Sequence, residues 1–218
     1  PPTPDFDHAR RGNNDNKIWG NDFSYAAAHG LELTFSFGNK IVRNRLVGNA
    51  ICGIWGGYSR QTMIIDNTIE ENGDSGYGLE RGGVNIEHGQ NNLIEGNHFR
   101  ANKCGVHLWW DEDAHLSELP CTRANGHESR GERIMLNSFD GDELAIQNRA
   151  SASLLLQENR YANVGCKLET TDPNVVDGAL RDVSFYNPIG SLLYVADSDI
   201  PGATRPVGAR SGLTGRDK

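Results

Sequence analysis

The chain contains no stretch of about 18 apolar residues, which is the least that crosses a bilayer as a helix. Its first residues, Pro1-Pro2-Thr3-Pro4, have neither the basic nor the apolar segment of a secretory signal peptide. We therefore expect a soluble chain with no membrane partner, from which any signal peptide has been removed.

Positive charge is also scarce. There are 21 Lys and Arg against 29 Asp and Glu, which gives a net charge of -8 and a pI near 5.3. A general nucleic-acid surface needs the opposite balance, so nucleic acid is not expected as a partner. The four cysteines (Cys52, Cys104, Cys121 and Cys166) lack CxxC spacing, which argues against a zinc knuckle. Cys104 and Cys121 could form a disulfide or stay free thiols, and the sequence leaves both alternatives open.

Turn-forming residues are abundant instead. The 26 Gly and 21 Asn together make 47 of the 218 residues, too many for a helix bundle. A chain of this length has room for one sizeable domain. The composition therefore predicts one all-β domain with many turns.

A repeat, apolar-x-x-Asn-x-apolar, runs through the chain. Its six copies are Ile18–Phe23, Ile41–Leu46, Ile64–Ile69, Ile94–Phe99, Ile134–Phe139 and Leu156–Tyr161. The anchoring asparagines (Asn21, Asn44, Asn67, Asn97, Asn137 and Asn159) step by 23, 23, 30, 40 and 22 residues. Two loops are therefore inserted into a regular array, at about 73–82 and 111–130.

A second Asn or Asp follows four or five places later in five repeats, at Asn49, Asn72, Asn102, Asp142 and Asn163. A short strand with alternating apolar residues comes next. Asn tolerates left-handed backbone at corners, and its amide can bond to the same Asn in the coils above and below. A leucine-rich repeat has a similar length, but its Leu-x-x-Leu-x-Leu core is absent. We predict a right-handed parallel β-helix, a solenoid of about six or more coils with two loop insertions.

With these motifs the sequence resembles the right-handed parallel β-helix superfamily, the pectin-lyase-like and NosD-like carbohydrate-binding and sugar-hydrolase repeats. The resemblance covers about residues 18–169 and is specific for fold rather than for reaction. Asp111-Glu112-Asp113-Ala114-His115 is only loosely similar to the Asp-Pro-His-Asp element of mannuronan epimerases, since it lacks the Pro and the order. The resemblance implies a polysaccharide ligand but names no chemistry.

Three regions are expected along the chain: a leading segment or incomplete coil at 1–16, the β-helix at 17–170, and terminal strands with a linker-like tail at 171–218. Two strands are predicted in the last region, at Val183–Tyr186 and Leu192–Val195. Further domains of a longer chain are expected partners.

Stacking the six long strands in register predicts which residues face outward. One outward row is Glu32, Trp55, Asn85, His107, Ala145 and Lys167; the other is Thr34, Gly57, Glu87, Trp109, Gln147 and Glu169. Leu144 and Cys166 are predicted to face inward beside Val106, with Cys166 a buried free thiol. Polar groups between aromatic plates suit sugar rings. We therefore predict substrate binding by Trp55, Tyr58, Arg81, Asn85, His88, Trp109 and Trp110.

Both insertions emerge beside these rows and are expected to flank an open cleft centred on Asn85, Glu87, His88, His107 and Trp109. The predicted catalytic residues are Glu87, His107, Asp111 and Asp113. Glu87 with Asp111 or Asp113 would form the carboxylate pair of a glycoside hydrolase. His107 would instead be the base of a lyase or epimerase, with Arg81, Arg123 or a cation neutralising a uronate. His107, His115, Asp111 and Asp113 are a third option as metal ligands.

The sequence thus predicts binding and processing of an extracellular polysaccharide, by hydrolysis or by lyase or epimerase chemistry. The setting would be secreted, periplasmic or at the cell surface. The alternative is a non-catalytic carbohydrate-binding or structural, adhesive module. No cofactor is required and no metal site is assigned, although Ca²⁺ is a candidate.

Overall fold

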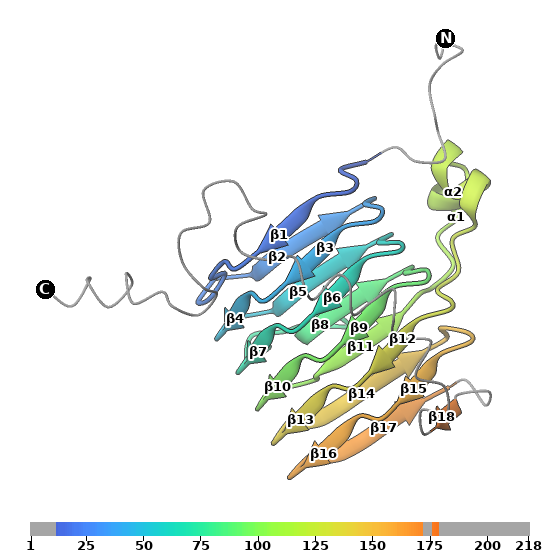
Figure 1. Ribbon diagram of the computed structural model, residues 1–218. Coiled ribbons are helices and arrows are strands. Elements are labelled where there is room, and N and C mark those ends of the chain that lie inside the picture. The colour runs from blue at the N-terminus through green and yellow to red at the C-terminus, as the bar shows by residue number, and fades with distance from the viewer. Residues whose placement is uncertain (1–11, 172–175, 179–218) are drawn as a thin grey trace, which may run out of the picture.

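The computed structural model describes residues 12–171 and 176–178. In these residues three parallel sheets wind around one core as a stack of coils (Figure 1), so the predicted right-handed parallel β-helix is confirmed. The strands predicted at 183–186 and 192–195 lie outside the described residues.

Each coil from β3 to β17 contributes one strand to each sheet, whereas the first described coil contributes β1 and β2 and the last contributes β18. The first sheet contains β1 (Lys17–Trp19), β3 (Lys40–Val42), β6 (Met63–Ile65), β9 (Leu93–Glu95), β12 (Arg133–Met135), β15 (Leu155–Gln157) and β18 (Val176–Gly178). The second contains β4 (Arg45–Val47), β7 (Thr68–Glu70), β10 (His98–Arg100), β13 (Ser138–Asp140) and β16 (Arg160–Ala162). The third contains β2 (His29–Thr34), β5 (Cys52–Gly57), β8 (Gly82–Glu87), β11 (Val106–Trp109), β14 (Leu144–Arg149) and β17 (Cys166–Thr170).

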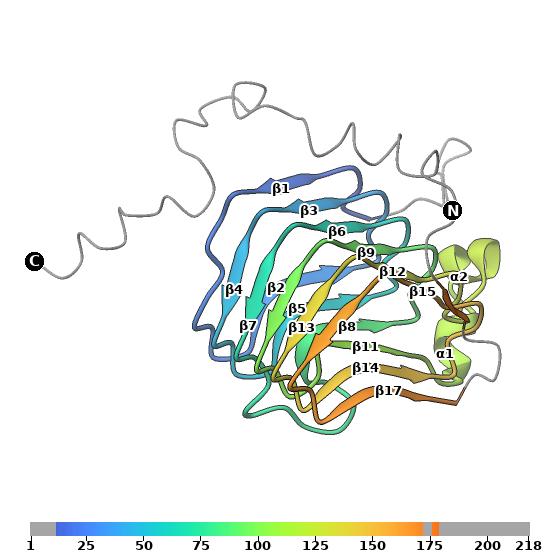
Figure 2. The ribbon, with the colours of Figure 1, turned by 60° about the horizontal axis from the view of Figure 1, so that its bottom comes forward.

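The two predicted insertions leave the stack where the sequence places them. Residues 73–82, the first insertion, connect β7 to β8, and residues 111–130, the second insertion, follow β11. The second insertion forms two short helices, α1 (Ala114–Ser117) and α2 (Pro120–Asn125), at one side of the coils (Figure 2). Among the described residues, no helix is long and apolar enough to cross a membrane.

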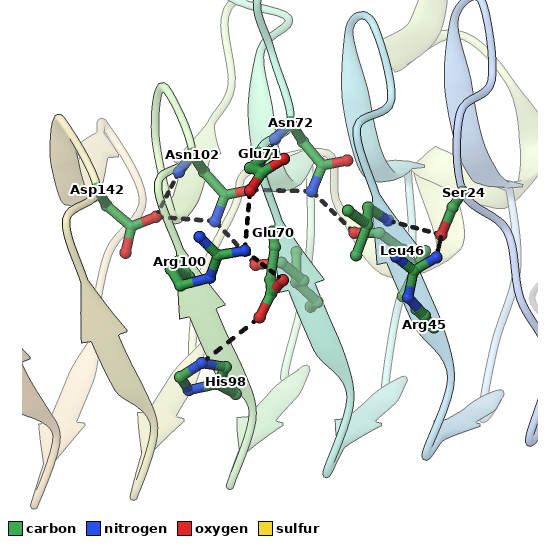
Figure 3. Close-up of polar contacts among 12 residues, drawn as sticks. Ser24, Arg45, Leu46, Glu70, Glu71, Asn72, His98, Arg100, Asn102 and Asp142 are labelled. Atoms are coloured by element: carbon green, nitrogen blue, oxygen red, sulfur yellow. Dashed lines mark hydrogen bonds and ion pairs between the residues drawn. The ribbon is translucent and has the colours of Figure 1, made fainter. Parts of the chain in front are cut away.

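Asparagine ladders hold the corners, as predicted. Asn44 donates from its backbone N–H and its Nδ2 to Oδ1 of Asn67, and Asn67 makes the same two bonds to Asn97. At the next corner Asn72, Asn102 and Asp142 stand in line (Figure 3). A third ladder, not identified from the repeat, runs through Asn92 to Glu132. These bonds pair buried amides that stacking removes from water.

The backbone reason for the corners differs from the predicted one. The anchor asparagines do not have positive φ; the residue before each anchor does, for example Arg43 at 52°, Asp66 at 55° and Leu136 at 55°. The anchor is selected for its amide, which reaches both neighbouring coils. The left-handed turn is therefore made one residue earlier, in several coils by a residue with a Cβ.

One apolar side chain from each short strand between β3 and β15 in the first two sheets fills the interior. Those of the first sheet are Ile41, Ile64, Ile94, Ile134 and Leu156, all fully buried. In the second sheet Phe99 and Phe139 stack with ring centroids 4.7 Å apart. Burying each such side chain contributes about 1.5–3 kcal/mol to folding, and no coil achieves this burial without its neighbours.

The predicted register of the third sheet is correct as far as β11 and wrong from β11 to β14. Val106 pairs with Ile146 rather than with Leu144, and His107 pairs with Gln147 rather than with Ala145. The hydrogen-bonded corner residues Asn102 and Asp142 set this register. Val106 lies four places after Asn102, and Ile146 lies four places after Asp142. Ala145 is level with Gly105 and is fully buried in the core, so its predicted outward position is also wrong.

The cysteines differ from two expectations. All four are free, so Cys104 and Cys121 form no disulfide, although both are buried. Cys166 is exposed rather than buried. It lies on β17, the last strand of the third sheet in the described chain, so no described coil covers its far side.

Candidate functional site

Strand pairing brings together the outward residues of β8 and β11, as predicted. Glu87 is the register partner of Trp109, and Asn85 is the partner of His107. Trp109 Nε1 donates a hydrogen bond of 2.8 Å to Asn85 Oδ1. Trp109 and Asn85 are thus hydrogen-bonded across neighbouring strands in the middle of the third sheet.

The first insertion covers part of this surface. Leu79 O accepts a 2.6 Å hydrogen bond from Asn85 Nδ2 and lies 2.9 Å from His107 Nδ1. Asn85, His107 and Trp109 are exposed by 0, 1 and 7% respectively. The open position predicted for these three residues is therefore wrong, because the path of the insertion crosses them. Their roles in binding and catalysis stay predictions.

His107 is isolated from solvent. Burial lowers its pKa to about 4, with the Leu79 carbonyl acting in the opposite direction and Arg81 in the same one. Its Nε2 is buried without a hydrogen-bond partner. The ring is therefore neutral near pH 7, and a polymer on the outer surface does not reach it in this arrangement.

The second insertion covers the corner beside the third sheet. His127 O accepts from His88 Nδ1, Gly126 O from Arg60 and Glu128 O from Gln90. The ring of His88 stacks on that of Tyr58 with centroids 4.4 Å apart, and the Trp110 ring lies 6.2 Å away. Tyr58 and His88 are consequently buried, whereas Trp110 is only half-buried.

Glu87 is the last residue of β8 and lies beside the corner that the second insertion covers. Its Oε1 is 3.7 Å from His88 Nε2, and Asp111 Oδ1 is 4.0 Å from the same nitrogen. Burial raises the pKa of Glu87 to about 7, and the negative charges of Asp111, Glu80 and Asp113 add to that rise. Burial also lowers the pKa of His88, against the His127 carbonyl.

The remaining predicted residues lie around this group. Asp113 caps α1 by accepting hydrogen bonds from the N–H groups of His115 and Leu116. Arg81 is exposed, and Trp55 is half-buried with its ring stacked on His29 at 5.9 Å. The metal option built on His107 and His115 is not assembled, since the first is buried under one insertion and the second is exposed on the other.

Within the described residues, Glu87, His88 and Asp111 are the one group of three potential metal ligands, with ligand atoms within 4.8 Å of one another. The sequence predicted the pairing of Glu87 with Asp111 and placed His88 in the same cleft, but it did not group these three residues as metal ligands. The backbone carbonyls of Leu79 and His127, which orient both histidines, were missed because a carbonyl carries no sequence signature.

A cavity of about 490 Å³ opens elsewhere, on the first described coil, between Lys17, Leu31 and Glu32. It is two strands of the third sheet away from β8 and contains none of the predicted catalytic or substrate-binding residues. We therefore treat the Glu87 region alone as the candidate site.

A family model described as a right handed beta helix region matches residues 6–118, more than half of the chain. No curated protein matches the sequence.

Proposed function

Because the chain belongs to the right-handed β-helix family, whose stacked strands present a long outer face, we propose that it binds and processes a polysaccharide along the third sheet. The reaction would take place beside Glu87 and Asp111. The polymer itself would be extracellular, so the proposal implies a secreted, periplasmic or surface location.

One observation carries the proposal: carboxylates and an aromatic ring converge where the second insertion meets the third sheet. Glu87 is half-buried, the side chain of Asp111 is 64% exposed, and Trp110 is half-buried next to them. Sugar rings offer flat C–H faces to aromatic side chains and hydroxyls to carboxylates. The combination supports a sugar ligand better than an apolar or anionic one.

Among the chemistries left open by the sequence, the geometry favours those that use these carboxylates. Oxygens of Glu87 and Asp111 lie within 4.8 Å of one another. Two carboxyl groups about 5 Å apart are also the arrangement that acts on a glycosidic bond in retaining hydrolases. His107 is not included, because the first insertion buries it.

A screen over neutral and uronate polysaccharides, with release of reducing ends and of unsaturated products as the readouts, tests this proposal. We expect Glu87→Gln and Asp111→Asn to lower turnover at least about 100-fold, as loss of a catalytic carboxylate does. Trp110→Ala should mainly raise KM. The control is Asp66→Asn, since Asp66 is an exposed carboxylate on a distant corner, ion-paired with Arg43.

The alternative is binding without turnover. It predicts affinity for a polysaccharide that falls with Trp110→Ala while no product is released by any variant. Neither binding nor turnover across the whole panel would overturn the proposal and leave a structural or adhesive role.

A further inference from the structure

The imidazole of His88 is held in one orientation. Its side chain is fully buried, one ring face stacks on Tyr58, and Nδ1 lies 2.5 Å from the carbonyl oxygen of His127. A carbonyl can only accept, so Nδ1 carries the proton of this bond. In the neutral ring Nε2 therefore presents a lone pair, and Nε2 makes no hydrogen bond.

That lone pair faces two carboxylates. Glu87 Oε1 and Asp111 Oδ1 lie 3.7 and 4.0 Å from Nε2, too far for a hydrogen bond from a protonated ring. Three electron-rich atoms thus surround one point with no hydrogen bond among them, and one belongs to a side chain with no exposure to water. Such an arrangement is unfavourable unless a cation occupies the point.

We propose that Glu87, His88 and Asp111 bind a divalent transition-metal ion of the Zn²⁺ type. Ligands about 2.1 Å from a tetrahedral zinc lie about 3.4 Å from one another. The observed separations exceed this by a few tenths of an ångström for the two contacts of Nε2. Asp111 is exposed and Glu87 half-buried, so both carboxylates have room to close around the ion.

The surroundings of His88 favour this class of ion. Histidines that bind metals usually donate their other ring N–H to a carbonyl or carboxylate, which orients the ring as His127 O does here. An imidazole ligand and only three protein donors suit Zn²⁺ better than Ca²⁺, which takes six to eight oxygens.

Three protein ligands leave a further coordination position for water or a sugar oxygen. The metal site therefore deepens the proposed function by giving the same carboxylates a defined role, as ligands of an ion rather than as a free acid and nucleophile pair. The role of the ion in the reaction rests on the proposed function. The binding of the ion is nevertheless measurable without any polysaccharide.

The test is titration of the full chain with Zn²⁺ by calorimetry, and with Co²⁺ by visible absorption, in a Cys166→Ser background that removes the exposed thiol. We expect saturable binding of one ion. Asp111→Asn and Glu87→Gln should each weaken it at least 10-fold. His88→Gln should do the same, with its fold checked by circular dichroism because the residue is buried.

Two neighbours in the second insertion serve as matched controls. Glu112→Gln removes the same charge as Asp111→Asn from an adjacent exposed position, and His115→Gln removes an exposed imidazole. Both should leave the affinity within about twofold. Equal losses in the controls, absence of saturable Zn²⁺ binding, or binding of Ca²⁺ alone would overturn the proposal.

The two proposals fail in different ways. Saturable Zn²⁺ binding without any active polysaccharide supports the metal site and counts against the proposed function alone. Polysaccharide turnover that survives complete chelation, in a chain that binds no Zn²⁺, overturns the metal site and leaves the proposed function standing.

Discussion

Asp142 ends the ladder that begins at Asn49, and its carboxylate fits that place imperfectly. Oδ1 accepts hydrogen bonds from the backbone N–H and Nδ2 of Asn102, but Oδ2 is buried with no partner. In Asn102 the equivalent atom is an amide nitrogen that donates to Ile69 O. A protonated carboxyl could donate in the same way, and burial raises the pKa of Asp142 to about 6 despite the bonds from Asn102.

This shift predicts how stability depends on pH at one residue. The folded-state pKa lies above the unfolded value near 3.9, so the stabilisation from Asp142 is present below about pH 4 and is lost as pH rises through 6. Asp142→Asn should therefore raise the free energy of unfolding by about 2–3 kcal/mol above pH 7 and change it little below pH 4. Urea unfolding at both pH values measures this.

Asp66→Asn is the control for that experiment, because Asp66 is exposed at another corner. A gain from Asp142→Asn that is equal at both pH values would contradict a titration of this carboxyl. It would point instead to packing differences between Asp and Asn.

The ladder is the element that joins the coils at each corner. Oδ1 of Asn97 accepts from the backbone N–H and Nδ2 of Asn67, and its Nδ2 donates to Ile64 O and to Asn137 Oδ1. Its truncation leaves buried amide groups in two coils unpaired. Each unsatisfied group costs about 1–3 kcal/mol.

We expect Asn97→Ala to lower the free energy of unfolding by about 3 kcal/mol or more. Asn159→Ala, at the half-buried end of the same ladder, should cost about 1 kcal/mol, because water can replace the lost bonds there. Chemical denaturation of both variants measures the difference. Equal losses would mean that burial does not set the cost of losing a ladder hydrogen bond.

At the scale of the whole molecule, burial decreases from the middle coils to the ends of the described stack. Ile64, Ile94 and Ile134 are fully buried, whereas Ile18 on the first coil and Leu168 on the last are only partly buried. A solenoid coil contacts only its neighbours, so its local stability follows the number of coils that cover it.

Hydrogen exchange should therefore be slowest in the strands from β6 to β13 and faster in β1, β2, β16 and β17. The exchange rates of peptides from each coil, measured by mass spectrometry, report this gradient. Uniform protection across all coils would show instead that the stack opens as a single unit.

The sequence by itself determined the coils, their period and the two points of insertion, because each corner needs an amide that reaches its copies above and below. It also predicted the neighbours of Glu87, since strand pairing follows from the corners as far as β11. The slip at β14 arose because apolar alternation repeats every two residues and accepts a shift of two, whereas the Asn102–Asp142 bonds do not.

Only the tertiary structure decided which outward residues stay accessible. The insertions have no periodic pattern, so their lengths do not reveal that Leu79 O lies over Asn85 and His107, or that His127 O holds His88. Those contacts join residues far apart in the chain through backbone carbonyls that every residue possesses. Burial and orientation of the two histidines therefore depend on the folded paths of the loops, which local residue preferences do not specify.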